Sequence, residues 1–187
     1  MPKFVSFIIA GTPGAGKTTV LAGAKLDEKG AKLINMGSEM LRHSKLQDRD
    51  KLRRLDAREQ KRLRAKVINS LAKEKGLFVI DTHLSIKQGN IYLPGFSRDE
   101  LHKLNVKSII YIDANAKEIL KRRLKDKSRS REQESEEEIE EQKSINLAML
   151  SVAATELNIP VYIFNNKEGK AKEISKDIEK LFEEAVL

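Results

Sequence analysis

Short apolar runs alternate along this chain with longer segments in which apolar residues recur every three to four positions. The runs are rich in β-branched and aromatic residues, which is typical of buried strands. They predict five strands, at 4–10, 32–36, 77–81, 106–113 and 161–164. The periodic segments predict helices over about 16–28, 37–47 and 56–76, and three more that carry Leu120 and Leu124, that begin at Ser135, and that carry Ile174 and Ile178.

This alternation of strands and helices predicts the fold class. Each strand-to-strand connection is long enough for a right-handed crossover, so we expect an α/β fold with a doubly wound, five-stranded parallel sheet. No repeat or linker divides the chain, which favours a single domain over 1–187. Gly89, Pro94 and Gly95 indicate a loop, and the polar residues 125–134 indicate a second loop that is mobile.

The segment GTPGAGKTT, residues 11–19, matches the phosphate-binding pattern G-x-x-x-x-G-K-[ST]. A predicted strand precedes it and a predicted helix follows it, as that pattern requires. Gly14 and Gly16 allow the backbone to turn so that successive N–H groups point inward. The helix N-terminus adds partial positive charge, Lys17 reaches the β- and γ-phosphates, and the Thr18 hydroxyl can ligate Mg²⁺.

The nucleotide-binding set is therefore Gly11, Thr12, Pro13, Gly14, Ala15, Gly16, Lys17, Thr18 and Thr19. A carboxylate is also needed for the metal. Asp81 ends a predicted strand at the edge of the sheet where ligands bind, so we favour a role in holding Mg²⁺ over that of an ordinary helix cap. Asp113 also ends a strand, but there a cap or a turn is the better interpretation.

Composition narrows the classes of function. The 187 residues carry a formal net charge of +8, which calls for a polyanionic ligand, and they include no Cys. Disulfides, thiolate catalysis and a Cys-based zinc site are thereby excluded. No apolar run is long enough to span a membrane and the start does not resemble a signal peptide, so we expect a cytoplasmic protein.

Basic residues gather in two places. Residues 42–66 hold eleven Lys or Arg against four acids, and residues 117–131 hold eight. Phosphoryl transfer needs cations around the transferred group, although solvated helix faces would produce the same clusters. Arg122 and Arg123 are adjacent on a helix and diverge by about 100°, so we expect only one of them to face the nucleotide. A GTPase is disfavoured, because Gly169 stands where the base-reading motif that begins at Asn166 would need Asp.

The chain contains the segments GTPGAGKTT (11–19), NMGSEMLR (35–42), DRDKLRRLD (48–56), IDTH (80–83), YLPG (92–95) and the arginines of 122–131. Taken together, these segments make the chain resemble an adenylate kinase of the archaeal type over nearly its whole length. The resemblance implies reversible transfer of the ATP γ-phosphoryl group to AMP, with Mg²⁺ as cofactor. It also implies a P-loop kinase fold with a helical AMP-binding insertion at about 37–75, a short lid at about 125–134, and homo-oligomers, specifically trimers.

The resemblance also assigns roles to individual residues. It implies Arg42 as a ligand of the AMP phosphate, Arg129 with Arg131 as contacts of the transferred phosphoryl group, and Asp81 as an aid to Mg²⁺ binding. From the residues themselves we expect Lys17 and Arg123 to complete the catalytic set, Arg53 and His83 to belong to the AMP site, and Thr18 to be a metal ligand. Two departures matter. Common adenylate kinases have D-G-F-P-R where this chain has D-T-H-L, so His83 or a cation of 42–58 takes over that work, unless His83 is only a loop histidine bonded to backbone. Met149 stands about where an Arg is expected to face the phosphates.

Two other functions share the phosphate-binding argument. One is a kinase for another nucleotide or small molecule, which would differ only in its acceptor pocket. The other is an ATPase that works on RNA or in ribosome assembly, in which the net charge of +8 would bind the RNA phosphates. Aromatic residues make up only 5% of the chain and form no stacking motif, which disfavours nucleic acid as a partner. We therefore expect ATP and AMP as ligands.

Overall fold

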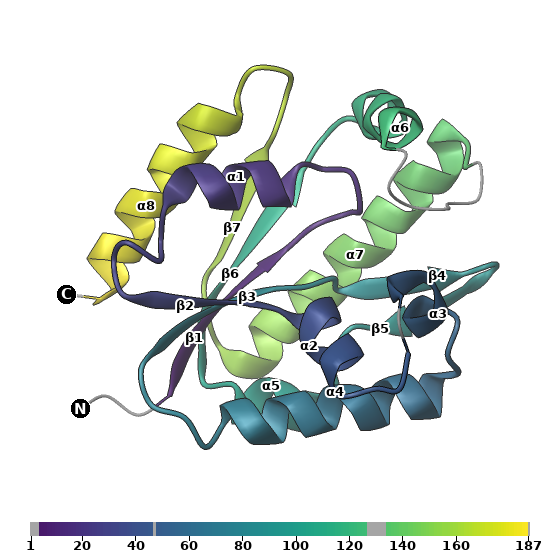
Figure 1. The fold of residues 1–187 in the computed structure, drawn as a ribbon. Helices are drawn as coiled ribbons and strands as arrows, with labels where there is room; N and C mark the ends of the chain where they lie inside the picture. The colour runs from purple at the N-terminus through teal and green to yellow at the C-terminus, as the bar shows by residue number, and fades with distance from the viewer. Residues whose placement is uncertain (1–3, 47, 127–133, 187) are drawn as a thin grey trace.

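The computed structural model describes residues 4–46, 48–126 and 134–186. At its centre lies the predicted five-stranded parallel sheet, and its strand order is β2-β3-β1-β6-β7 (Figure 1). These strands are β1 Val5–Ala10, β2 Ala31–Asn35, β3 Leu77–Asp81, β6 Val106–Asp113 and β7 Val161–Asn165. The helices are α1 Lys17–Ala24, α2 Met36–Arg42, α3 Arg49–Arg53, α4 Ala57–Leu71, α5 Arg98–Lys103, α6 Ala116–Lys125, α7 Glu136–Leu157 and α8 Ala171–Val186.

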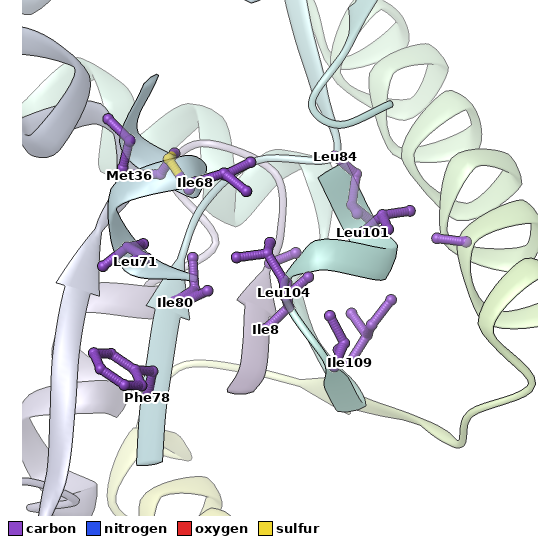
Figure 2. Packing of buried hydrophobic residues seen from close by; sticks show 14 of the residues in the cluster. Ile8, Met36, Ile68, Leu71, Phe78, Ile80, Leu84, Leu101, Leu104 and Ile109 are labelled. Atoms are coloured by element: carbon purple, nitrogen blue, oxygen red, sulfur yellow. The ribbon is translucent and has the colours of Figure 1, made fainter. Parts of the chain in front are cut away.

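Helices cover both faces of the sheet, which makes the sheet doubly wound (Figure 1). Neighbouring residues of β1 serve opposite cores: Ile9 packs with α1 and α8, whereas Ile8 packs with α4, α5 and α7. Figure 2 shows this second core, in which Ile80 of β3 lies beside Leu71 of α4, and Ile109 of β6 belongs to the same cluster as Leu101 of α5. Burial on both faces explains why the central strands β1, β3 and β6 are nearly continuous apolar runs rather than alternating ones.

The segment that the sequence predicts as a loop is a β-hairpin. It consists of β4 Ser85–Gln88 and β5 Ile91–Pro94, which pair antiparallel as a separate two-stranded sheet. Gly89 at its turn has a φ of +55°, a value that glycine adopts without strain. The expectation of a loop was wrong because the two-residue Gly-Asn turn between short apolar strands is itself a hairpin signal.

Helix ends are the other point of difference. The first helix ends at Ala24 instead of about 28, because Lys25 adopts the left-handed conformation. The predicted helix 37–47 ends at Arg42, a separate short α3 follows, and α5 is an additional helix. Asp56 caps α4 as expected, and Ser135 forms a capping box with Glu138 at the start of α7.

Two remaining expectations concern strand ends and membranes. Asn115, not Asp113, caps α6, because the Asn115 side chain lies one residue before the helix and accepts from the Lys117 amide. Asp113 instead lies 3.6 Å from the Lys143 ammonium group. No helix in the described ranges is long and apolar enough to cross a membrane. Most of the lid predicted at 125–134, namely 127–133, lies outside the described residues.

Candidate active site

A cavity of about 500 Å³ opens at the carboxyl end of the sheet. The loop after β1 lies on one side of it, and α2, α3 and α4 line the other. The start of the β4–β5 hairpin and the end of α6 complete its wall. Because loops that follow parallel strands meet at this edge, residues far apart in the sequence face one space.

The loop at 11–19 has the geometry of a phosphate cradle. Gly14 and Gly16 both have a φ of +94°, which other residues adopt only with strain. The Ala15 amide donates to the Thr12 carbonyl at 3.0 Å, which closes the turn. A Cβ on Gly16 would clash with the Asn166 side chain, so the site needs glycine for space as well as for conformation. The N-terminus of α1 follows directly, and its first residues, Lys17 to Thr19, line the cavity.

Lys17 and His83 meet across the mouth of this loop. The Lys17 side chain is buried, and its Nζ donates to the Gly11 carbonyl at 3.1 Å. The His83 Nδ1 lies 3.1 Å from the same carbonyl oxygen and 3.4 Å from Lys17 Nζ. Of the two interpretations of His83, the structure shows the contact with backbone, and because the side chain also lines the cavity its role at the acceptor site stays a prediction.

Asp81 is held in place by a neighbouring strand. The Asn35 side chain donates to Asp81 Oδ2 at 2.7 Å, and its own oxygen accepts from the Ser38 amide and from Arg49 Nη2, both at 3.0 Å. The Thr18 hydroxyl belongs to the same cavity wall. One carboxylate and one hydroxyl fit Mg²⁺, which uses few protein ligands and completes its octahedron with phosphate oxygens and water. The described residues accordingly contain no cluster of three or more His, Cys, Asp or Glu side chains that could bind a metal alone.

Arginines from α6 brace the phosphate loop from behind. Arg122 donates to the Ala15 carbonyl at 3.1 Å, and Arg123 donates to the Pro13 carbonyl at 2.8 Å. Both line the cavity, and the prediction that only one of them faces the nucleotide stays a prediction. The arginine side chain is long enough for two adjacent residues to reach the same loop from diverging Cα–Cβ bonds. Asn166, at which the GTPase-like motif begins, also donates to the Ala15 carbonyl, at 2.8 Å.

Helix α7 faces the phosphate loop with amides. Gln142 accepts from Arg123 Nη2 at 3.1 Å, and Asn146 donates to the Thr12 hydroxyl at 3.1 Å. Met149, the position at which an Arg was expected, instead packs against the apolar core. The expectation was wrong because α7 turns its polar face to the loop at Asn146 and Gln142, three and seven residues earlier. Thr12 is fully buried and is engaged in this structural network.

The acceptor side of the cavity differs most from the sequence-based assignment. Arg53 lines it as expected, but Arg42 does not: its side chain is 74% exposed and pairs with Glu39 at 3.2 Å. Arg49 and Arg64 were not singled out, yet both line the cavity. Arg49 could have been found from its place in the segment DRDKLRRLD. The lid candidates Arg129 and Arg131 lie outside the described residues.

Comparison with known proteins identifies the family to which this site belongs. The chain is 34% identical to an adenylate kinase of Thermoplasma acidophilum, over 93% of this chain and 96% of the relative. It is 36% identical to an adenylate kinase of Methanocaldococcus jannaschii, over 86% of this chain and 89% of the relative. The chain belongs to the adenylate kinase family. A broader family model, described as an AAA domain, matches residues 10–140.

Solved structures place this adenylate kinase family member among P-loop kinases by fold. A shikimate kinase from Acinetobacter baumannii superposes with a TM-score of 0.67 at 20% identity, over 96% of this chain and 93% of that one. A shikimate kinase from Aquifex aeolicus gives a TM-score of 0.63 at 15% identity, over 97% and 98%. At these identities the likeness concerns the fold alone, and it matches the predicted doubly wound sheet.

Proposed function

We propose that the protein catalyses the reversible, Mg²⁺-dependent transfer of the γ-phosphoryl group of ATP to AMP, which gives two ADP. Membership of the adenylate kinase family over nearly the full length of the chain carries this proposal. The cavity supports it, because a phosphate cradle and a cluster of acceptor-side arginines open onto the same space. A phosphoryl donor and a phosphorylated acceptor can therefore bind end to end.

The donor half of the reaction is assigned to the loop at 11–19. Its main-chain amides and the N-terminus of α1 would hold the donor phosphates, and the Lys17 ammonium would neutralise charge that develops on the transferred group. Thr18 and Asp81 would hold Mg²⁺, which supplies charge neutralisation between the phosphates when it is bound. The hydrogen bond from Asn35 fixes the orientation of the Asp81 carboxylate in advance.

The acceptor half is assigned to cationic side chains around the start of α2 and α3. Arg49 and Arg53 line the cavity and would bind the acceptor phosphate, with His83 at the junction between the two halves. Arg42 stays a candidate only through the resemblance, since its guanidinium lies away from the cavity lining. Arg129 and Arg131 remain proposed as lid residues that contact the transferred group and help to exclude water.

We also propose that the protein assembles with copies of itself, as trimers by the family resemblance. Exposed apolar side chains support this assignment: Val161 and Ile163 lie on the edge strand β7, and Leu147 lies on α7. An exposed edge strand with apolar side chains is a surface that proteins usually cover. Light scattering on a size-exclusion column would give the mass, and a monomer at micromolar concentration would refute the proposal.

A nucleotide panel tests the proposed reaction. The protein is mixed with Mg-ATP and each nucleoside monophosphate in turn, and ADP formation is measured. We expect fast ADP formation with AMP and its loss when Mg²⁺ is chelated. Fast turnover with a different monophosphate and none with AMP would indicate another kinase. Slow hydrolysis that ignores AMP but increases with RNA would indicate the ATPase alternative.

A further inference from the structure

Two polar side chains line the α4 side of the cavity and have no part in the phosphate-binding assignments made above. They are Gln60 and Arg64 of α4, which are 2% and 5% exposed. Their spacing of four residues places them one turn apart on the same face of the helix. Buried polar groups of this kind need hydrogen-bond partners, so the atoms that the protein leaves unpaired indicate what a ligand must supply.

The Gln60 amide is held in one orientation. Its Nε2 donates to the Arg53 carbonyl at 2.9 Å and to the Leu55 carbonyl at 3.0 Å. Both donors of the amide nitrogen are thereby used on the chain connecting α3 to α4. Within the described parts of the chain, Gln60 Oε1 accepts no hydrogen bond from protein. Gln60 therefore presents a fixed acceptor beside the cavity.

The Arg64 guanidinium is also held in one orientation, and it presents donors where Gln60 presents an acceptor. Its Nε donates to Glu100 Oε2 at 3.0 Å, and both side chains of this ion pair are buried, at 7% and 6% exposure. Glu100 is itself fixed, because the same oxygen accepts from the Ser97 amide at 2.7 Å. The two terminal nitrogens of Arg64 have no hydrogen-bond partner in the described ranges. Arg64 thus presents a positioned pair of donors.

The wall around this pair is apolar. Met36, Met40 and Leu52 are buried side chains that also line the cavity. A few fixed polar groups in an apolar pocket are the usual arrangement for orienting a small planar ligand. The phosphate of the acceptor, in contrast, must reach Lys17 and Asp81, and Figure 1 shows α4 on the face of the sheet opposite α1. The α4 end of the cavity is therefore the place for the base.

We propose that Gln60 and Arg64 form hydrogen bonds with the edge of the acceptor base and thereby select 6-aminopurines over 6-oxopurines. In this assignment Gln60 Oε1 accepts from the 6-amino group, and an Arg64 terminal nitrogen donates to the adjacent ring nitrogen. A 6-oxo group would set oxygen against the fixed oxygen of Gln60. The inference rests on the proposed kinase function and adds the residues that determine its specificity.

The test removes the same contact from the substrate and from the protein. With Mg-ATP saturating, kcat/KM is measured for AMP, for IMP, and for purine riboside 5′-monophosphate, which lacks the 6-amino group. Because each loss leaves a buried group unpaired, we expect AMP to be favoured on the order of 10- to 100-fold over both. In Gln60→Ala, kcat/KM for AMP should fall by a similar factor, whereas that for purine riboside 5′-monophosphate should change little.

Arg64 is tested with ring-nitrogen analogues. The analogues are 1-deaza- and 7-deaza-AMP, and Arg64→Lys keeps the positive charge opposite Glu100. We expect one of the two analogues to be a poor acceptor for the wild-type enzyme and to be no worse for Arg64→Lys. Arg62→Gln is the matched control on the same helix, because Arg62 is exposed and lies outside the cavity lining. It should leave every kcat/KM unchanged.

Each outcome decides the inference. Wild-type enzyme that uses AMP, IMP and purine riboside monophosphate equally well would overturn it and leave the proposed kinase function standing. Equal losses for AMP and the analogues in the Gln60 and Arg64 variants would also overturn it, since that result indicates a structural or phosphate-binding role. Failure to form ADP from any monophosphate would remove the proposed function, and the inference with it. Gln60→Ala should fold, because Gln88 Nε2 also donates to the Arg53 and Leu55 carbonyls.

Discussion

Helix α5 is held by two ion pairs of the same chemistry and opposite environment. Glu100 pairs with Arg64 in the interior, where the side chains are 6% and 7% exposed. Glu156 of α7 pairs with Arg98 of α5 at 2.5 Å, with side chains that are 30% and 73% exposed. Replacing each glutamate by glutamine removes one charge and little volume. The two substitutions therefore compare a buried pair with an exposed one, although Glu156 also lies 3.0 Å from His102 Nε2.

The expected magnitudes differ severalfold. Removing one partner of a buried ion pair leaves an uncompensated charge and costs about 3–5 kcal/mol. The Arg64 guanidinium borders the cavity, where water reaches it, so we expect Glu100→Gln to cost near the lower end, about 3 kcal/mol. The Ser97 amide retains an acceptor in the glutamine oxygen, so the helix cap contributes little to this loss. Glu156→Gln should cost about 1 kcal/mol or less, because exposed pairs gain little over solvation.

Equilibrium unfolding in urea at neutral pH measures both values. For a chain of this length, a loss of about 3 kcal/mol should lower Tm by roughly 6–12 °C, which gives an independent reading. Raising the salt concentration should weaken the contribution of Glu156 but not that of Glu100. The reasoning would be refuted if Glu100→Gln destabilised the protein no more than Glu156→Gln. That outcome would mean that the interior around Arg64 solvates the charge as well as water does.

Three further predictions concern the phosphate loop, the lid and the start of α7. Lys17→Ala should lower kcat by on the order of 10²-fold or more with the fold intact, because it removes a charge that acts on the transition state, and unchanged turnover would reject that role. Arg129→Ala and Arg131→Ala should reduce kcat more than AMP affinity; if neither does, the lid assignment is wrong. The Ser135 amide and Lys87 hold the pKa of Glu138 below its ordinary 4.5, so its stabilising contribution is present above pH 4.5 and disappears as the pH falls through the lowered value. The slope of unfolding free energy against pH below 4.5 should flatten in Glu138→Gln.

The phosphate half of the site could be predicted from sequence because its information is local. A strand, a glycine turn and a helix start occupy consecutive residues, and each glycine has a conformational reason that the motif already states. The central strands β1, β3 and β6 could be predicted equally well, since strands buried on both faces are largely apolar. The hairpin at 85–94 was missed, although its Gly-Asn turn is a local signal too. Prediction failed there because Pro94 and Gly95 were read as loop residues and not as the end of a strand.

The residues of the acceptor half of the site could not be predicted from local sequence in the same way. Arg49 contacts Asn35 and Ser38 across a gap in sequence, and nothing local distinguishes it from Arg42, which points to solvent. Similarly, Met149 and Asn146 differ by less than one helical turn, so only the packing of α7 decides which of them faces the phosphate loop. Basic clusters therefore predicted the region of the acceptor site but not its members.

One signal of the acceptor site was nevertheless present in the sequence. The apolar stripe of α4 runs through Leu63, Val67 and Leu71, and the same face includes Gln60 and Arg64. Polar residues on the buried face of an amphipathic helix contradict the pattern that builds the core, and a chain retains such residues where each has a partner or a function. Half of each side chain is satisfied by protein: the Gln60 nitrogen by two carbonyls and the Arg64 Nε by Glu100. The unpaired atoms are one acceptor, on Gln60, and one pair of donors, on Arg64, and both lie on the same cavity wall. They match the amino group and the adjacent ring nitrogen of an aminopurine, and this match, more than the number of positive charges, suits the site to such a base.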